Sequence, residues 1–175
     1  LGNLISGYTY NNSFRRWNAS ISSPISTFNF NTVQGWNANL DLFYRKNYDE
    51  FRRYLSLNAQ VNYGFGDEQL RGTLSATYKF NNISRPFLTL SGGVITAQFN
   101  ANDPISNLIN TAYSLFAEKN FMKLYDKSFV EIAFSNELFN GFRLRSALSY
   151  QRRKPLFNTT DQVWYPKKDR VYTSN

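Results

Sequence analysis

Apolar and polar residues alternate with a period of two over the middle of the chain. Between positions 55 and 65 the odd positions are apolar and the even positions are polar or glycine. The stretch 70–80 repeats the pattern, with apolar residues or glycine at its even positions and residues such as Arg71 and Thr73 between them. A period of two places apolar side chains on one face of a β-strand and polar ones on the other. The pattern therefore predicts an all-β fold whose sheet has two faces of opposite character.

The same reasoning predicts eight strands. They lie near residues 4–10, 14–23, 35–46, 52–65, 70–80, 87–98, 128–138 and 142–152. The Asn140-Gly141 pair between the last two favours a tight hairpin turn. Within 87–98 the apolar side changes around Gly92-Gly93, which is typical of a bulge or bend.

One segment has a helical period instead. Asp103-Pro104 offers an N-cap followed by a first-turn proline. The apolar residues that follow at helical spacing are Ile105, Leu108, Ile109, Ala112, Leu115 and Phe116. The spacing predicts a short amphipathic helix over 104–119, inside a long loop that spans 99–127.

Two architectures suit such strands: a soluble sandwich or barrel with the apolar face inside, and a membrane barrel with this face towards lipid. Sandwich strands are commonly about 5 to 6 residues long, whereas membrane strands need about 9 to 11. The predicted strands 52–65, 70–80 and 87–98 reach the longer class, and aromatic residues flank successive turns as interfacial girdles do. We therefore expect residues 1–175 to form a single transmembrane antiparallel β-barrel region, or part of a larger barrel.

The connections between these strands are unequal in length. Bacterial barrels have short periplasmic turns and longer extracellular loops. The connections 47–51, 81–86 and Asn140-Gly141 should therefore face the periplasm. Those at 24–34, 66–69 and 99–127 should lie outside.

Composition excludes several kinds of chemistry. The chain has no cysteine and no histidine, so it cannot contain a thiol nucleophile, an imidazole base or a Cys/His zinc or haem site. Its net charge of +8 comes from single or paired basic residues without a nucleic-acid-binding motif, so we expect no nucleic-acid partner. The sequence therefore predicts a protein that is not an enzyme, with no catalytic residue, cofactor or metal site.

Charged residues on the polar side of the strands form one set of candidate site residues. By strand parity the residues that should face the lumen are Asp41, Arg45, Arg71, Lys79, Glu131, Arg143 and Arg145. The carboxylates Asp41 and Glu131 are expected to pair with lumenal arginines, because a buried charge is tolerated mainly when it is paired.

A second candidate set lies at the basic C-terminal end, where aromatic residues are interleaved with cations. Such a segment suits contact with anionic lipid head groups or with an acidic partner protein. The set comprises Arg152, Arg153, Lys154, Trp164, Lys167 and Lys168.

Three strings of the sequence carry a resemblance to a known family: FNFNTVQGW at 28–36, NDPISNLINTAYSLFAEKNFMKLYDKSF at 102–129 and QRRKPLFNTTD at 151–161. They resemble the C-terminal part of a family of Bacteroidota outer-membrane proteins of unassigned function. In that family an N-terminal carboxypeptidase-regulatory-like domain precedes a long β-barrel region. The resemblance implies a location in the bacterial cell outer membrane, with outer-membrane lipid and other envelope proteins as partners. It also implies that the chain is a C-terminal fragment of a longer protein.

The sequence leaves more than one function open. The first is a non-enzymatic integral outer-membrane β-barrel protein that acts in transport or as a subunit of an envelope assembly. The alternative is a secreted β-sandwich that binds polysaccharide through its aromatic residues. A third, a barrel-borne hydrolase, would need Asp41 and Glu131 within about 5 to 10 Å of each other, and nothing in the sequence places them so.

Overall fold

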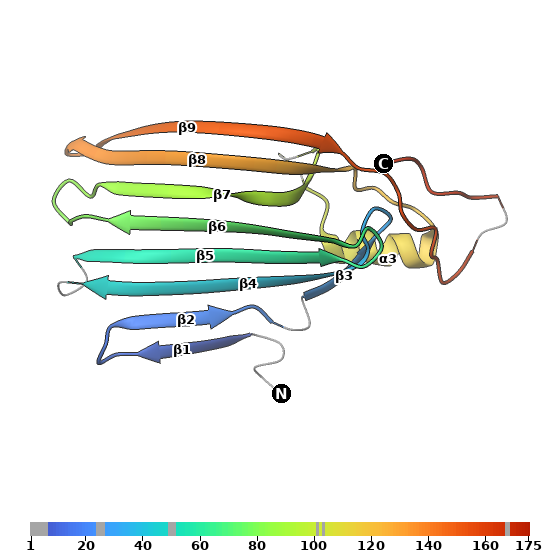
Figure 1. Cartoon of the computed structure of the whole chain (residues 1–175), viewed down its shortest axis with the longest axis horizontal. Helices are drawn as coiled ribbons and strands as arrows, with labels where there is room; N and C mark the ends of the chain where they lie inside the picture. Colours follow the sequence, from blue (N-terminus) through green and yellow to red (C-terminus); the bar gives the residue numbers. More distant parts are fainter. Residues whose placement is uncertain (1–6, 24–26, 49–51, 101, 103, 167–168) are drawn as a thin grey trace.

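The computed structural model describes the whole chain except residues 1–6, 24–26, 49–51, 101, 103 and 167–168. The described residues form a nine-stranded antiparallel sheet and a short helix (Figure 1). The strands are β1 Tyr8–Asn12, β2 Trp17–Ile21, β3 Phe28–Asn31, β4 Gly35–Tyr48, β5 Arg53–Gly64, β6 Gln69–Lys79, β7 Phe87–Gln98, β8 Leu124–Phe139 and β9 Phe142–Pro155. The helix is α3 Asn107–Ala117.

The sheet is a meander in which neighbours along the chain are neighbours in space. Its order is β1-β2-β4-β5-β6-β7-β8-β9, and β3 pairs with the first part of β4. Consequently β2 pairs with residues 42–46 of β4, whereas β3 pairs with residues 35–38. The β4–β5 and β5–β6 ladders run without a register shift, as expected where one face is uniformly apolar and a slip would reverse it.

Each of the eight predicted strands has a counterpart in the structure, and one strand was missed. The first counterpart, β1, begins at Tyr8, and residues 4–6 of its predicted range lie outside the described residues. The missed strand is β3, which lies in the predicted loop 24–34, where an asparagine-rich sequence gives a weak strand signal. In addition, β8 begins at Leu124, so the long loop ends at Lys123 and does not reach 127. Residues 124–127 therefore extend the ladder with β7, and its last pair joins Leu124 to Gln98.

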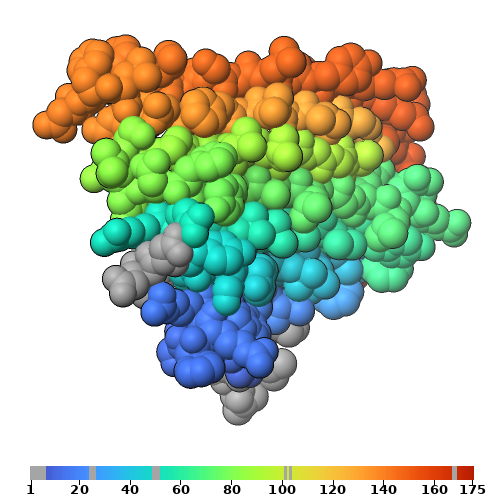
Figure 2. Space-filling model, turned by 60° about the vertical axis from the view of Figure 1, so that its left-hand side comes forward, coloured from blue at the N-terminus to red at the C-terminus, as the bar shows by residue number. Residues whose placement is uncertain are grey.

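The sheet does not close into a barrel within the described residues. Its two edge strands, β1 and β9, are not paired with each other. Figure 2 shows the strands stacked from β1 in blue to β9 in orange-red, with these two at opposite sides of the molecule. The prediction of a barrel closed by this chain alone is therefore wrong, and the described residues form an open sheet.

The predicted change of side within β7 is confirmed. Thr96 and Asp126 stand where strict alternation would put them on the apolar face, yet both reach the polar face at Arg71. Gly93 has a φ of +137°, and a Cβ there would lie 2.1 Å from the carbonyl oxygen of Gly72. The bend therefore requires glycine at this position.

The helix differs from its prediction in both bounds and orientation. Ser106 stands at the N-cap, so α3 starts three residues after Pro104, and Asp103 lies outside the described residues. The helix ends where Glu118 adopts a left-handed φ of 52°. Its buried residues are Asn110, Ser114 and Leu115, while Leu108, Ile109 and Phe116 are exposed. In the described part of the chain, no helix is long and apolar enough to cross a membrane.

The two ends of the sheet are unlike. Figure 1 shows the hairpin turns β1–β2, β6–β7 and β8–β9 at one end, and β3, α3 and the C-terminal segment at the other. We call these the turn end and the loop end. A small apolar core of Val33, Met122 and Leu124, with Ile105 and Leu156 packed against it, lies at the loop end.

Candidate functional site

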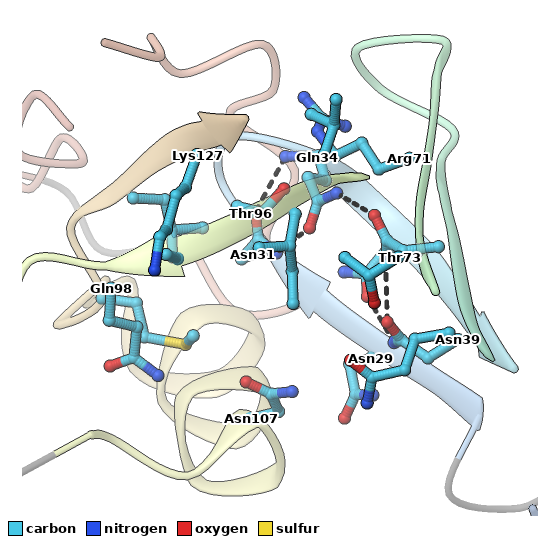
Figure 3. Close-up of a pocket in the computed structure, with 18 of the residues that line it drawn as sticks. Asn29, Asn31, Gln34, Asn39, Arg71, Thr73, Thr96, Gln98, Asn107 and Lys127 are labelled. Carbon is cyan, nitrogen blue, oxygen red and sulfur yellow. Dashed lines mark hydrogen bonds between the residues drawn. The ribbon is translucent and has the colours of Figure 1, made fainter. Parts of the chain in front are cut away.

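A polar cavity opens at the loop end, on the polar face of the sheet. Its volume is about 580 Å³, and strands β3 to β8 and the start of α3 all contribute to its wall. The polar side chains that line it are Asn29, Asn31, Gln34, Asn37, Asn39, Asp41, Gln60, Asn62, Arg71, Thr73, Thr96, Gln98, Asn107 and Lys127. Figure 3 shows Gln98 and Lys127 on one side of this cavity and Asn39 and Thr73 on the other.

A chain of hydrogen bonds between amide side chains runs along one wall (Figure 3). The Asn31 amide donates to Gln34 over 3.2 Å, and Gln34 donates to Asn62 over 2.6 Å. Asn62 donates to Asn39 over 2.8 Å, and Asn39 donates to Asn37 over 3.0 Å. Because each amide is both donor and acceptor, the chain fixes which atom of every group remains free for another partner.

Arg71 lies beside this chain of amides, as the direct cross-strand neighbour of Asn62. Its side chain is 2% exposed and forms ion pairs with two carboxylates. Nε lies 2.6 Å from Asp126 Oδ1, and Nη2 lies 2.6 Å from Asp67 Oδ2. The two ion pairs thereby hold the guanidinium between β8 and the β5–β6 turn.

Two donors on this wall have no hydrogen-bond partner among the described residues. They are Nη1 of Arg71 and Nδ2 of Asn37, and both are buried atoms. Each residue is 3% exposed, and each lines the cavity. A buried donor without a partner is costly, and these two enclosed atoms carry that cost in the wall of the cavity.

The loop end that frames the cavity is held by a second polar network. Asn110 of α3 donates to Asn120 over 3.0 Å, and Asn120 donates to Thr32 over 2.7 Å. Thr32 in turn donates to Asn158 over 2.7 Å. Three strings that are far apart in the sequence, 28–36, 102–129 and 151–161, therefore meet in one network. They are the strings that carry the family resemblance.

Trp164 belongs to an aromatic cluster that joins this frame to α3. Its ring centroid lies 5.0 Å from Phe116 and 6.4 Å from Trp36. Its backbone N–H donates to the carbonyl of Leu115 over 2.9 Å. The residue is still half exposed, so one part of the ring packs inside the chain and another part is open to a neighbour.

The predicted lumen-facing cations near the turn end stack on aromatic rings. The Arg45 guanidinium lies 3.9 Å from the Tyr54 ring centroid, and the Lys79 ammonium lies 5.9 Å from the same ring. Arg143 lies 6.0 Å from the Phe87 ring. Each ring offers its negative face to a cation, and the cluster spans strands β4 to β7 together with β9.

The two predicted carboxylates have different partners. Glu131 pairs with Arg145 at 3.6 Å, as expected. Asp41, which was also expected to pair with an arginine, accepts a hydrogen bond of 2.9 Å from the Gln60 amide. An amide serves here because Gln60 is the direct cross-strand neighbour of Asp41 in the register. Among the described residues, no group of three or more His, Cys, Asp or Glu side chains is arranged to hold a metal ion.

The basic segment of the C-terminal end is divided between two faces. Arg152 and Lys154 alternate with Arg153 along β9, so their side chains leave the strand on opposite sides. Arg153 lies 5.3 Å from the ring of Tyr125. Lys167 and Lys168, from the same candidate set, lie outside the described residues.

Sequence reasoning missed the partners of Arg71 and the role of Asn37. The Asp67–Arg71 pair is separated by four residues across a tight turn, and this spacing was a usable signal. The Asp126 contact spans 55 residues and depends on the change of side within β7. No local pattern indicates it.

The opposite face of the sheet is apolar and open. The register aligns one apolar or glycine residue from each of seven strands into a single row: Ile21, Leu42, Ala59, Leu74, Gly92, Val130 and Tyr150. A second row lies two residues nearer the turn end: Ala19, Tyr44, Leu57, Ala76, Leu90, Ile132 and Leu148. Large members such as Leu74, Val130 and Leu148 are more than half exposed.

These features define an all-β domain whose sheet has one apolar face and one polar face, with an amide-lined cavity on the polar face. The chain belongs to the family of unknown function DUF5686, whose C-terminal domain matches residues 2–175. Searches of the curated proteins and of the solved structures gave no match. The resemblance seen in the sequence is thus confirmed as far as membership of a family of unknown function, and its outer-membrane location stays a prediction.

Proposed function

We propose that this domain is part of the wall of an integral outer-membrane β-barrel, with its apolar rows towards lipid and its polar face towards the lumen. The protein acts in transport or as a subunit of an envelope assembly, and it has no enzymatic activity of its own. The observation that supports this proposal is the pair of continuous apolar rows, open across seven strands. Monomeric soluble proteins rarely expose apolar patches of more than a few hundred Å².

The dimensions of the apolar face fit a bilayer. On β5 the apolar positions run from Leu55 to Tyr63, which is roughly 27 Å along the strand at about 3.4 Å per residue. A strand tilted by about 40° carries these positions over roughly 20 Å of height, against about 25 Å for the apolar band of such barrels. Aromatic pairs flank the turns, as with Tyr78 and Phe80, and Phe139 and Phe142.

Further strands are needed to complete such a barrel. The outer edge of β9 runs over 14 residues that are all exposed, and β1 forms the other edge of the sheet. Unpaired strand edges recruit partners readily. Additional strands between β9 and β1 would close the barrel and satisfy both edges.

The basic end of β9 fits the level of the lipid head groups in this arrangement. Arg152 follows Tyr150 and Leu148 along the same alternating row, so it continues the lipid-facing side towards the loop end. There a long cationic side chain keeps its stem in the apolar layer and its charge among lipid phosphates.

Detergent dependence tests the proposal directly. The full protein should aggregate when detergent is removed and should recover a monodisperse, folded state in micelles or lipid vesicles. The measurement is size-exclusion chromatography with light scattering, with and without detergent. A protein that stays monodisperse in plain buffer would contradict a lipid-facing surface and would favour a secreted polysaccharide-binding β-sandwich.

A further inference from the structure

The chemistry of the cavity at the loop end identifies a class of ligand. Amide side chains dominate its wall, and the hydrogen-bond chain from Asn31 to Asn37 orients them. An oriented amide presents a donor and an acceptor side by side. Vicinal hydroxyl groups of a sugar ring present the complementary pair.

Two donors in this wall have no partner, so the wall can offer hydrogen atoms to a ligand. Nδ2 of Asn37 and Nη1 of Arg71 are buried and have no partner among the described residues. Both residues line the cavity at 3% exposure. Both atoms are enclosed in the wall, so hydroxyl oxygens of a ligand accept from them only when the two side chains turn towards the cavity on binding. The cost of two unsatisfied buried donors would then be relieved.

The charge balance argues for a neutral ligand. Two cations, Arg71 and Lys127, stand against three carboxylates, those of Asp41, Asp67 and Asp126. Arg71 is already shared by two of these carboxylates. An anion would therefore meet a site whose positive charge is more than compensated, whereas a polyhydroxylated neutral molecule has no such penalty.

We propose that the cavity binds a neutral saccharide through its amide wall, with the side chains of Asn37 and Arg71 turning towards the cavity to donate to sugar hydroxyl groups. The volume of about 580 Å³ lies within the range of about 300 to 1,000 Å³ that is usual for ligand pockets. The proposal does not rest on the membrane location, because all the residues it uses belong to the described sheet and its loops.

The test is calorimetric titration of the full protein with neutral trisaccharides. The probes are maltotriose, cellotriose, chitotriose and mannotriose, with inorganic phosphate as the anionic comparison. The micelle is an amine-oxide detergent, because glycoside detergents would present sugar head groups to the cavity. At least one trisaccharide should bind saturably, and phosphate should not bind.

Variants locate the binding. Asn37→Asp keeps the oxygen that accepts from Asn39 and removes the free donor, so binding of the trisaccharide should weaken about tenfold. The matched control is Asn58→Asp. Asn58 lies in the neighbouring strand β5, on the same polar face of the sheet, but it does not line the cavity. This variant should bind as the unmodified protein does. Thr73→Val, which changes a lining residue to an apolar group of the same shape, should also weaken binding.

Three outcomes would overturn the proposal. They are the absence of binding by any trisaccharide, binding of phosphate in place of the sugars, and equal effects of Asn37→Asp and Asn58→Asp. If Asn37→Asp fails to fold, Thr73→Val decides, because threonine and valine are both good strand residues. Failure of the membrane proposal would show in detergent dependence and would leave this titration unchanged.

Discussion

Replacement of Arg71 should cause a large loss in the free energy of unfolding. Its side chain is 2% exposed and holds Asp67 and Asp126. Replacement by a neutral residue leaves two carboxylates facing each other without a cation, and breaking a buried pair in this way costs about 3 to 5 kcal/mol. We expect Arg71→Met to lower the free energy of unfolding by this amount, measured by urea titration in micelles.

Arg145 supplies the matched control. It pairs with Glu131 at 3.6 Å, but its side chain is 68% exposed. Exposed pairs contribute at most about 1 kcal/mol, so Arg145→Met should have a small effect. Equal losses at the two arginines would show that the Arg71 pair is solvated and that the cavity wall is not rigid.

Tyr172 makes the frame of the cavity sensitive to alkaline pH. Its hydroxyl lies 2.7 Å from the carbonyl oxygen of Ser114. Burial raises the pKa of Tyr172 to about 12 from an ordinary value of 10.0, and the charges of Glu118 and Asp161 add to the rise. The folded state therefore favours the neutral phenol.

The sign of the pH dependence follows from this raised pKa. The contribution of Tyr172 to stability is complete below pH 10 and is lost as the pH rises towards 12. The stability difference between the unmodified protein and Tyr172→Phe should narrow over this window, measured by thermal unfolding at successive pH values. A difference that stays constant over this window would contradict the burial of the Tyr172 hydroxyl.

At the residue scale, the sequence predicted the face of a side chain better than its partner. Alternation placed Arg71 and Glu131 on the polar face, and the expected pairing of Glu131 with an arginine is confirmed by its 3.6 Å contact with Arg145. Which residue opposes another across the sheet depends on register and on the bend at Gly93. That information is absent from a local pattern, so the partners Gln60 for Asp41 and Asp126 for Arg71 were not predicted.

At the element scale, the two faces of a single strand should respond differently to the same change. Leu74 is 56% exposed and lies between Ala59 and Gly92 in an apolar row. In lipid, Leu74→Arg should cost about 2 to 4 kcal/mol near the bilayer centre, whereas Ser75→Arg on the polar face should cost much less. The measurement is the free energy of unfolding from lipid vesicles.

Leu74→Phe separates a lipid-facing position from a close-packed interior. Lipid should accommodate the larger ring with little loss, whereas an interior would be strained by about 1 to 3 kcal/mol. A loss in the upper part of that range would place another protein layer over this face.

The elements themselves were predicted unevenly for a physical reason. Strands such as β5 and β6 have long, regular alternation, because one of their faces is uniformly apolar. The helix α3 shows helical spacing, yet it buries Asn110 and Ser114 and exposes Leu108. Its polar residues are buried because they form hydrogen bonds with one another and with the loop that follows the helix. The spacing of apolar residues along the sequence does not indicate such bonds.

At the scale of the whole molecule, the two ends of the sheet differ in structure. The turn end has short hairpins, and the loop end holds the cavity, α3 and the C-terminal segment in a shared network (Figure 1). The sequence predicted which connections share an end, since strand crossings alternate. It did not predict that residues from 28–36, 102–129 and 151–161 would converge, because their contacts join positions that are far apart along the chain.

The connections are short at the turn end and long at the loop end, and this difference predicts how the protein is oriented in an outer membrane. Short turns face the periplasm in bacterial barrels and long loops face outwards, so α3 should be accessible from outside the cell. The chain has no cysteine, which allows a single cysteine to be placed at Leu108 on the exposed side of α3 or at Asn140 in the β8–β9 turn. An impermeant maleimide should label Leu108→Cys on intact cells, and Asn140→Cys only after the cells are broken. Labelling of Asn140→Cys alone on intact cells would reverse the orientation, and the cavity would then open towards the periplasm.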